Sequence, residues 1–289
     1  MKRIACILLA VLLTGCATGV RHGDEIVVCG RLLRTGTPVV LWTDPGGYDA
    51  YRPPTHFGTR SAASDPGRLH SLRQHIDQFV IHYDVSGVSR ECFRTLHDRR
   101  GLSVHFLLDL DGTIYQTLDL KERAWHATTS NDRAVGIEIA NVGAYSPGEP
   151  DPFAQWYAAG PDGWPVITIP PHLGDGGIRT RGFVGRPIRP HLVAGTINGR
   201  TLRQYDLTPQ QYASLIRLTA ALCRIFPKLR CDYPRDASGR LATGRLPDDV
   251  LAGHTGLIGH WHIQGEKVDP GPAFQWDLVV ENARSLLGR

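Results

Sequence analysis

Two histidines and an aspartate could supply the ligands of a hydrolytic zinc site. His82 lies near the C-terminal end of the apolar run Phe79 to Tyr83, and His260 lies in a Gly-His pair nine residues before Asp269. Catalytic zinc takes three protein ligands, commonly histidine with one carboxylate or cysteine, and keeps the fourth position for water. The chain has 13 histidines, however, and surface or hydrogen-bonded side chains explain these residues equally well.

The segments that would position such a site have the patterns of short strands. Phe79 to Tyr83 suits a buried strand because its residues are apolar, β-branched or aromatic. Residues 103–110 and 113–118 alternate around an Asp-Gly pair, which predicts a hairpin. Ala134 to Asn141 predicts another strand, and Glu138 lies among its apolar residues.

The clearest predicted helix begins at Thr208. Thr208, Pro209 and Gln211 supply an N-cap, a proline at the first helical position and a capping-box glutamine. Apolar residues then recur at helical spacing until Pro227, and a shorter helix is predicted for Arg90 to Arg99. Strands that alternate with helices predict an α/β fold with a mixed central β-sheet flanked by helices.

Composition divides the chain into three predicted parts. Residues 1–15 have the features of a signal peptide, residues 16–75 those of an N-terminal spacer or extension with some strand structure, and residues 76–289 form the main domain. From about residue 143 to residue 199 the periodicity is lost and Gly and Pro become dense. Because unstructured loops of this length are uncommon inside a compact domain, we expect an insertion there with short strands of its own.

The N-terminus indicates export and lipid anchoring. Lys2 and Arg3 precede the apolar run Ile4 to Leu13, which has about half the length that a bilayer crossing needs. The next residues, Leu-Thr-Gly-Cys, resemble the bacterial lipobox, which implies lipidation of Cys16 and removal of the peptide before it. Ala17 favours the outer membrane, facing the periplasm, by resemblance to lipoprotein sorting. An ordinary cleaved signal that happens to contain a cysteine is the alternative.

The overall charge argues against a nucleic-acid partner. The formal net charge is +4 over 289 residues, and two of the positive charges leave with the signal peptide. Four cysteines follow Cys16 in a compartment that permits disulfides, and none has the CxxC spacing of a thiolate zinc site. Their pairing stays open, as does the oligomeric state.

Five motifs carry a resemblance to a known family. In order along the chain they are Val80 to Tyr83, Val104 to Gln116, Arg123 to Ala127, Val135 to Ile139 and Gly259 to Phe274. Together they resemble the amidase-2 family of N-acetylmuramoyl-L-alanine amidases, which shares its fold with phage T7 lysozyme and the peptidoglycan recognition proteins. The resemblance implies zinc-dependent hydrolysis of the amide between N-acetylmuramic acid and L-alanine, in peptidoglycan or muropeptides.

The resemblance also implies a role for each site residue. His82, His260 and Asp269 correspond to the family's zinc ligands. Glu138 corresponds to its glutamate, and burial in an apolar strand would raise the pKa of this carboxyl and suit it to act as a general base. Lys267 corresponds to the lysine two residues before the last ligand and would stabilise the oxyanion of the tetrahedral intermediate.

Three further residues are expected to bind substrate. Trp125 and His126 belong to a motif that lines the groove in the family, and aromatic faces such as those of Trp125 and Tyr83 suit sugar rings. A packing role for Trp125 is equally plausible. His105, inside a predicted strand, is expected to be structural.

The choice of the second histidine ligand leaves alternatives. His254 also follows a glycine but is fifteen residues from Asp269, and His262 faces away from His260 if that segment is extended. We therefore prefer His260. A non-catalytic peptidoglycan-binding lipoprotein and a zinc peptidase acting within the stem peptide remain alternative functions.

Overall fold

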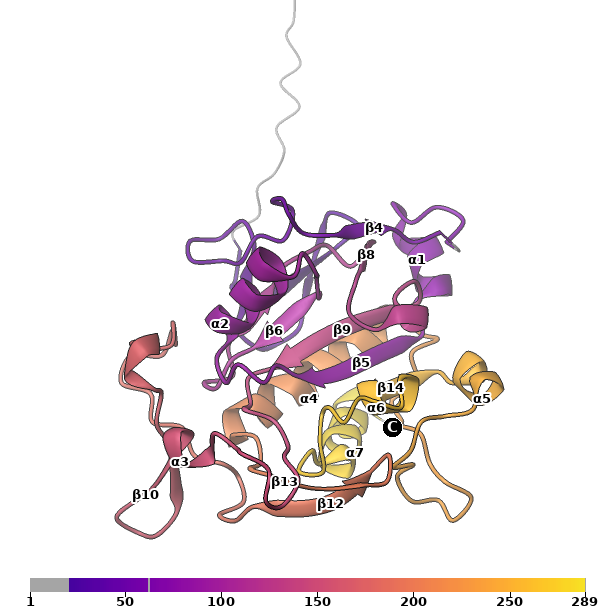
Figure 1. The fold of residues 1–289 in the computed structure, drawn as a ribbon. Coiled ribbons are helices and arrows are strands. Elements are labelled where there is room, and N and C mark those ends of the chain that lie inside the picture. The colour runs from indigo at the N-terminus through magenta and orange to yellow at the C-terminus, as the bar shows by residue number, and fades with distance from the viewer. Residues whose placement is uncertain (1–20, 62, 289) are drawn as a thin grey trace, which may run out of the picture.

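A mixed six-stranded sheet forms the centre of the computed structural model, which describes residues 21–61 and 63–288 (Figure 1). The strand order is β14-β5-β9-β6-β7-β3. β6 and β7 are antiparallel, and the other neighbours are parallel. This confirms the predicted α/β class with a mixed sheet. The strands are β3 (Val39–Leu41), β5 (Gln78–Tyr83), β6 (Phe106–Leu108), β7 (Ile114–Gln116), β9 (Ala134–Ile139) and β14 (Gly256–Gly259).

Helices cover both faces of this sheet (Figure 1). On one face, α4 (Pro209–Ile225) packs against α7 (Trp276–Leu287). On the other face, near β6, α2 (Ser89–Phe93) continues into the wider turns of the π-helix η1 (Arg94–Arg99). Outside residues 143–199, the other helices of the described chain are α1 (Leu69–His75), η2 (Thr128–Ser130), α5 (Asp248–Gly253) and α6 (His260–Ile263).

The capping box predicted for α4 is present. The Thr208 hydroxyl accepts a hydrogen bond from the Gln211 backbone N–H at 3.1 Å, and Gln211 Oε1 accepts one from the Thr208 N–H at 2.9 Å. The Thr208 hydroxyl also donates to the carbonyl of Leu110, at 2.7 Å. These bonds fix the start of the helix against the loop between β6 and β7.

The alternation of side chains along the strands decides where a cleft can form. Phe106 and Leu108 pack into the core with α4 and α7, whereas Leu107 between them packs against Phe93 of α2. In β5, Phe79 and Ile81 likewise face α4 and α7. Residues at even positions of β5 and β9 therefore point to the α2 side of the sheet.

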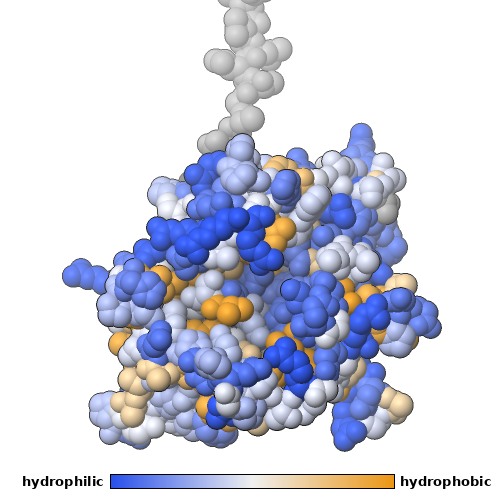
Figure 2. All heavy atoms as spheres, viewed as in Figure 1, coloured by the Kyte–Doolittle hydropathy of each residue, from blue (hydrophilic) through white to orange (hydrophobic). Residues whose placement is uncertain are grey.

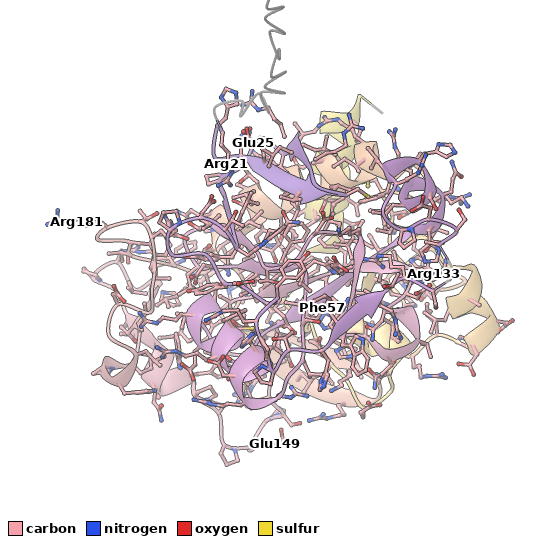
Figure 3. The ribbon with its side chains drawn as sticks, turned by 90° about the horizontal axis from the view of Figure 1, so that it is seen from above. Arg21, Glu25, Phe57, Arg133, Glu149 and Arg181 are labelled. Carbon is pink, nitrogen blue, oxygen red and sulfur yellow. The ribbon has the colours of Figure 1, made fainter. Side chains whose placement is uncertain are left out.

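The N-terminal segment, predicted as a spacer or extension with some strand structure, contains several strands. β3 is the edge strand of the central sheet, next to β7, and its three residues are buried. Two further pairs join β1 (Glu25–Val28) to β2 (Arg31–Arg34) and β4 (Phe57–Thr59) to β8 (Glu122–Ala124). Pairing in the sheet buries the apolar side chains of β3 and satisfies its backbone, so the segment belongs to the same folded unit. Figure 3 shows Phe57 on β4 across the top of the molecule.

The region from 143 to 199 contains several short elements, as expected. They are α3 (Phe153–Trp156), β10 (Tyr157–Ala159), β11 (Pro165–Ile167), η3 (Pro171–Leu173) and β12 (Val193–Ile197), which pairs with β13 (Arg200–Gln204). Arg181 lies at the outer edge of this region (Figure 3). The exact limits of the insertion and of the domains stay predictions.

The anchor prediction concerns residues that the structure leaves undescribed, since Cys16 and the signal peptide lie outside 21–61 and 63–288. Within these ranges, no helix has the length and apolar character needed to span a bilayer.

Candidate functional site

His82 and Glu138 are neighbours on adjacent parallel strands. His82 of β5 pairs in register with Glu138 of β9, and Glu138 pairs in turn with Leu107 of β6. Because His82 and Glu138 occupy even positions, both point to the α2 side, where the helix does not cover the ends of β5 and β9. The sheet thus holds an imidazole and a carboxyl side by side.

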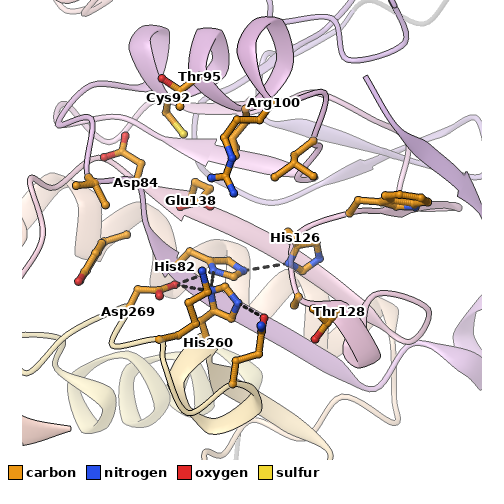
Figure 4. A pocket seen from close by; sticks show the side chains of 18 of the residues that line it. His82, Asp84, Cys92, Thr95, Arg100, His126, Thr128, Glu138, His260 and Asp269 are labelled. Atoms are coloured by element: carbon orange, nitrogen blue, oxygen red, sulfur yellow. Dashed lines mark hydrogen bonds and ion pairs between the residues drawn. The ribbon is translucent and has the colours of Figure 1, made fainter. Parts of the chain in front are cut away.

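Three buried side chains converge in front of this pair (Figure 4). His82 Nδ1 lies 3.1 Å from His260 Nδ1 and 2.8 Å from Asp269 Oδ2, and His260 Nδ1 lies 3.0 Å from the same oxygen. Atoms bound to one tetrahedral zinc ion are about 3.3 Å apart. The three atoms therefore have a spacing at which one small cation can be shared, and they form a group that could hold a metal ion.

The hydrogen bonds of His260 fix which ring nitrogen carries a proton. Gln264 donates from its amide nitrogen to Glu266 Oε1 at 2.7 Å, so its carbonyl oxygen Oε1 faces His260 Nε2 at 2.8 Å. His260 must therefore donate from Nε2, and neutral His260 has a bare lone pair at Nδ1. That lone pair points at the Asp269 carboxylate, an arrangement that a cation between them stabilises.

His82 has a different partner for its second nitrogen. His82 Nε2 lies 3.0 Å from His126 Nδ1. If His82 binds a metal through Nδ1, its Nε2 carries the proton and donates to His126, which fixes the orientation of the ligand ring. Gly136 makes room for this contact, since a Cβ there would lie 2.4 Å from the His126 ring.

The electrostatics of the cluster match the donor set of a zinc site. Burial, and then His260, lowers the pKa of His82 to about 4, so this imidazole is neutral at pH 7. Burial alone would raise the pKa of Asp269, but the adjacent His260 and His82 lower it below its ordinary value. Two imidazoles and one carboxylate are ligands that zinc commonly takes, so these residues fit the metal.

The cluster lies on the floor of a cleft of about 570 Å³. Figure 2 shows this face of the molecule hollowed across its middle, with hydrophilic side chains around apolar ones. Lining residues that the sequence singled out are Tyr83, Trp125, His126, Glu138 and Lys267.

Glu138 is a carboxyl whose second oxygen has no protein partner. Its Oε2 is buried and makes no hydrogen bond with the described residues. Burial, and then Asp269 and Asp84, raises its pKa well above the ordinary value. Arg100 extends from the end of η1 toward Glu138 (Figure 4). The carboxyl is therefore suited to accept a proton from a molecule in the cleft and to release it again.

The other expected site residues differ in exposure. Trp125 is 40% exposed and stacks on His56 from the N-terminal segment, with ring centroids 5.4 Å apart. Tyr83 is buried at the cleft wall. Lys267 is partly buried, and its ammonium has no hydrogen bond or ion pair to the described residues. The structure places all of them around the same cleft.

Neither alternative histidine reaches the cluster. His254 Nε2 bonds to the carbonyl of Leu257 at 3.1 Å, and His262 Nε2 bonds to that of Ala242 at 2.7 Å. The segment that contains His260 and His262 is helical from His260 to Ile263 and not extended. His105, expected to be structural, accepts a hydrogen bond from the Gly136 N–H on Nδ1.

Sequence reasoning missed several cleft residues. Arg100 lines the cleft from a segment outside the five motifs, and Arg123 lines it from the third motif, in which only Trp125 and His126 were singled out. Gln264 could have been found, because it lies four residues after His260, at the spacing that brings helical side chains together. Val85 and Thr128 also line the cleft, and nothing in their sequence context marks them.

One segment of the chain is similar to a known protein family. Residues 72–161 match the family model for N-acetylmuramoyl-L-alanine amidase, Amidase_2. The matched segment includes His82, His126 and Glu138 and ends before His260 and Asp269. This part of the chain is similar to that family of amidases. Among curated proteins, no sequence matches the chain significantly.

Several solved structures are similar to the chain at low identity. A selenomethionine derivative of AmpD is 16% identical, with 83% of this chain and 98% of that chain covered and a TM-score of 0.36. The amidase LysCS from Clostridium intestinale is 18% identical, with 75% and 86% covered and a TM-score of 0.38. AmiD from E. coli is 18% identical, with 72% and 57% covered and a TM-score of 0.39.

Proposed function

We propose that this protein hydrolyses the amide bond between N-acetylmuramic acid and L-alanine, in peptidoglycan or its fragments, with zinc as cofactor. The observation that supports this most is the convergence of His82, His260 and Asp269 beside the unpartnered carboxyl oxygen of Glu138. A zinc-dependent amidase needs both a site for the metal and a base next to it. The cleft of this chain holds both groups.

Each residue has a task in the proposed reaction. When bound by His82, His260 and Asp269, zinc lowers the pKa of water and polarises the scissile carbonyl. Glu138 takes a proton from the attacking water and passes it to the leaving amine of L-alanine. The Lys267 ammonium stabilises the negative charge on the carbonyl oxygen, which contributes about 3 kcal/mol in other oxyanion sites.

Trp125, His126 and Tyr83 are proposed to line the path of the substrate. Trp125 has the exposure that stacking on a sugar ring requires. Tyr83 offers only the edge of a buried side chain, and His126 is more closely engaged with His82 than with the open cleft. Trp125 is therefore the best candidate for a direct contact.

The proposed location is the cell envelope, with the chain held by a lipid on Cys16, on the outer membrane facing the periplasm. The basic residues Lys2 and Arg3, the short apolar run after them and the Leu-Thr-Gly-Cys ending support this location. Labelled palmitate should enter the wild-type protein and not Cys16→Ala. Equal labelling of both would contradict the anchor.

Digestion of purified sacculi tests the activity. The chain, with zinc present, should release free stem peptides that begin with L-alanine, as read by mass spectrometry. Products cut between stem residues would instead indicate a zinc peptidase. Sacculi that bind the protein but yield no product would indicate a binding module. The matched control is the same chain after removal of zinc by a chelator.

A further inference from the structure

Two β-branched residues of the cleft have a backbone conformation that such residues rarely adopt. In the described part of the chain, the non-glycine residues with positive φ are Cys29, Val85, Thr128 and Asn198. Val85 has φ +58° and Thr128 has φ +45°, and both line the cleft. A branched Cβ is crowded in the left-handed region, so each residue destabilises the fold.

Neither side chain compensates for this strain by packing or bonding. Val85 is 56% exposed, so most of its apolar surface remains in solvent. Thr128 is exposed as well, and its hydroxyl has no hydrogen-bond partner among the described residues. Glycine or asparagine would adopt the same φ at lower cost. Strained residues of this kind cluster at functional sites.

The backbone around Val85 is fixed by its buried neighbours. One oxygen of Asp84 accepts hydrogen bonds from the N–H groups of Ser86 at 3.0 Å, Gly87 at 2.9 Å and Asn141 at 3.2 Å. Gly87 lies directly against the Trp156 ring, where a Cβ would be 2.5 Å from it. The turn is therefore rigid, and the isopropyl group of Val85 is held at a set position.

The backbone before Thr128 is fixed in the same way. Asn131 Oδ1 accepts from the N–H groups of His126 at 3.1 Å and Ala127 at 2.6 Å. The carbonyl of Thr128 accepts from the N–H of Asn131 at 3.2 Å. The Thr128 side chain is left free to meet a molecule in the cleft.

Asp84, which directly precedes Val85, and Thr128 lie on opposite sides of the group formed by His82, His260 and Asp269 (Figure 4). Figure 4 shows Thr128 beyond His126. A substrate whose reacting amide is centred on the cluster therefore extends toward both sides. Val85 offers methyl groups, and Thr128 offers a hydroxyl that can donate or accept a hydrogen bond.

We propose that Val85 and Thr128 are substrate-contacting residues that flank the scissile amide and help to set its specificity. Val85 packs against one of the two methyl groups next to that amide, which belong to the lactyl group and to L-alanine. Thr128 hydrogen-bonds to a polar group on the opposite side. This inference depends on the proposed amidase function, because that function supplies the methyl groups.

The test compares Val85→Gly and Thr128→Gly with Cys29→Gly in the full-length chain. Glycine removes the strain in the two cleft variants, so the Tm of each should rise by about 2 °C. KM for muropeptides should rise about four-fold for Val85→Gly, the loss expected for one methyl contact, and about five-fold for Thr128→Gly. Cys29→Gly changes a residue outside the cleft and should leave KM unchanged. Zinc content should be the same in all three variants.

Substrates that lack one methyl group give the sharper test. Wild type should prefer the natural muropeptide over an analogue without the lactyl methyl or over one with glycine in place of L-alanine. Val85→Gly should lose one of these preferences. If it loses neither, or if Tm falls in both cleft variants, the proposal is wrong. A wild-type chain that cleaves no muropeptide would instead overturn the amidase function itself.

Discussion

The Nε2 atom of His82 lies 3.0 Å from Nδ1 of His126, so a proposed metal ligand is held by a second histidine. His126 was expected to contact substrate, and that prediction remains untested. The distance supports a positioning role in addition. A ligand histidine whose second nitrogen has a partner keeps its ring and tautomer in the orientation that the metal requires.

His126→Phe should therefore weaken zinc binding. Phenylalanine fills the space opposite Gly136 but leaves the buried His82 N–H without an acceptor. Partners of this kind contribute about 10- to 100-fold to metal affinity. Competition with a chromophoric chelator measures the affinity. His70→Phe, an exposed histidine on α1, is the control and should bind zinc as wild type does. Equal affinities of the two variants would rule out the positioning role.

The choice of ligands can be tested by metal content. His260→Ala should lose zinc, because it removes one of the three converging atoms. His254→Ala should retain zinc, because the His254 imidazole bonds to the Leu257 carbonyl and lies outside the cluster. Elemental analysis of the purified variants measures this. Zinc retained in the first and lost in the second would require a different ligand set.

Glu138→Gln should retain zinc and lose turnover. The amide has the shape of the carboxyl but cannot take a proton from water, so kcat should fall by about 10²- to 10⁴-fold. Because burial raises the pKa of Glu138, wild-type activity should fall on the acidic side at a pH above the ordinary range of a glutamate. Glu149→Gln, a change at an exposed carboxyl of the insertion (Figure 3), should leave kcat unchanged. Full activity of Glu138→Gln would show that another group is the base.

Asp109 should make the stability of the protein depend on pH. Its Oδ1 accepts from the Ser89 and Leu110 N–H groups, while Oδ2 is buried without a partner. Burial raises the pKa of Asp109 from 3.8 to about 7. The folded state therefore holds a proton that the unfolded state releases, so this group favours folding most at low pH. That contribution is lost as pH rises from about 4 to about 7.

Asp109→Asn removes this dependence and keeps the acceptor oxygen. The variant should equal wild type in free energy of unfolding near pH 4. At pH 8 it should be more stable, by a few kcal/mol at most. Urea unfolding at several pH values measures the difference. A difference that stays constant with pH would mean that Asp109 does not titrate in this range.

Local patterns predicted the elements, and tertiary contacts decided their partners. The apolar run around Ile81 and the capping box at Thr208 determine β5 and α4 from a few neighbouring residues. The run that became β3 predicted a strand but carried no sign of its partner β7, so its place in the central sheet was missed. Which strands pair with each other depends on the packing of the whole sheet, and local sequence patterns do not encode it.

The same distinction applies to the site. His82, Glu138, His260 and Asp269 could be selected because they belong to motifs with a fixed order along the chain. The strain at Val85 could not be predicted in this way, because a valine after a strand usually has negative φ. The positive φ of Val85 accompanies the hydrogen bonds that Ser86 and Gly87 donate to Asp84.

Hydrolysis in ¹⁸O-labelled water tests the central claim most directly. The metal-free protein should be inactive, and one equivalent of zinc should restore cleavage of a muropeptide. The label should then enter the lactyl carboxylate of N-acetylmuramic acid, and the released peptide should carry an unlabelled N-terminal L-alanine. Label in a carboxylate of the stem peptide, or cleavage that does not require metal, would contradict the account.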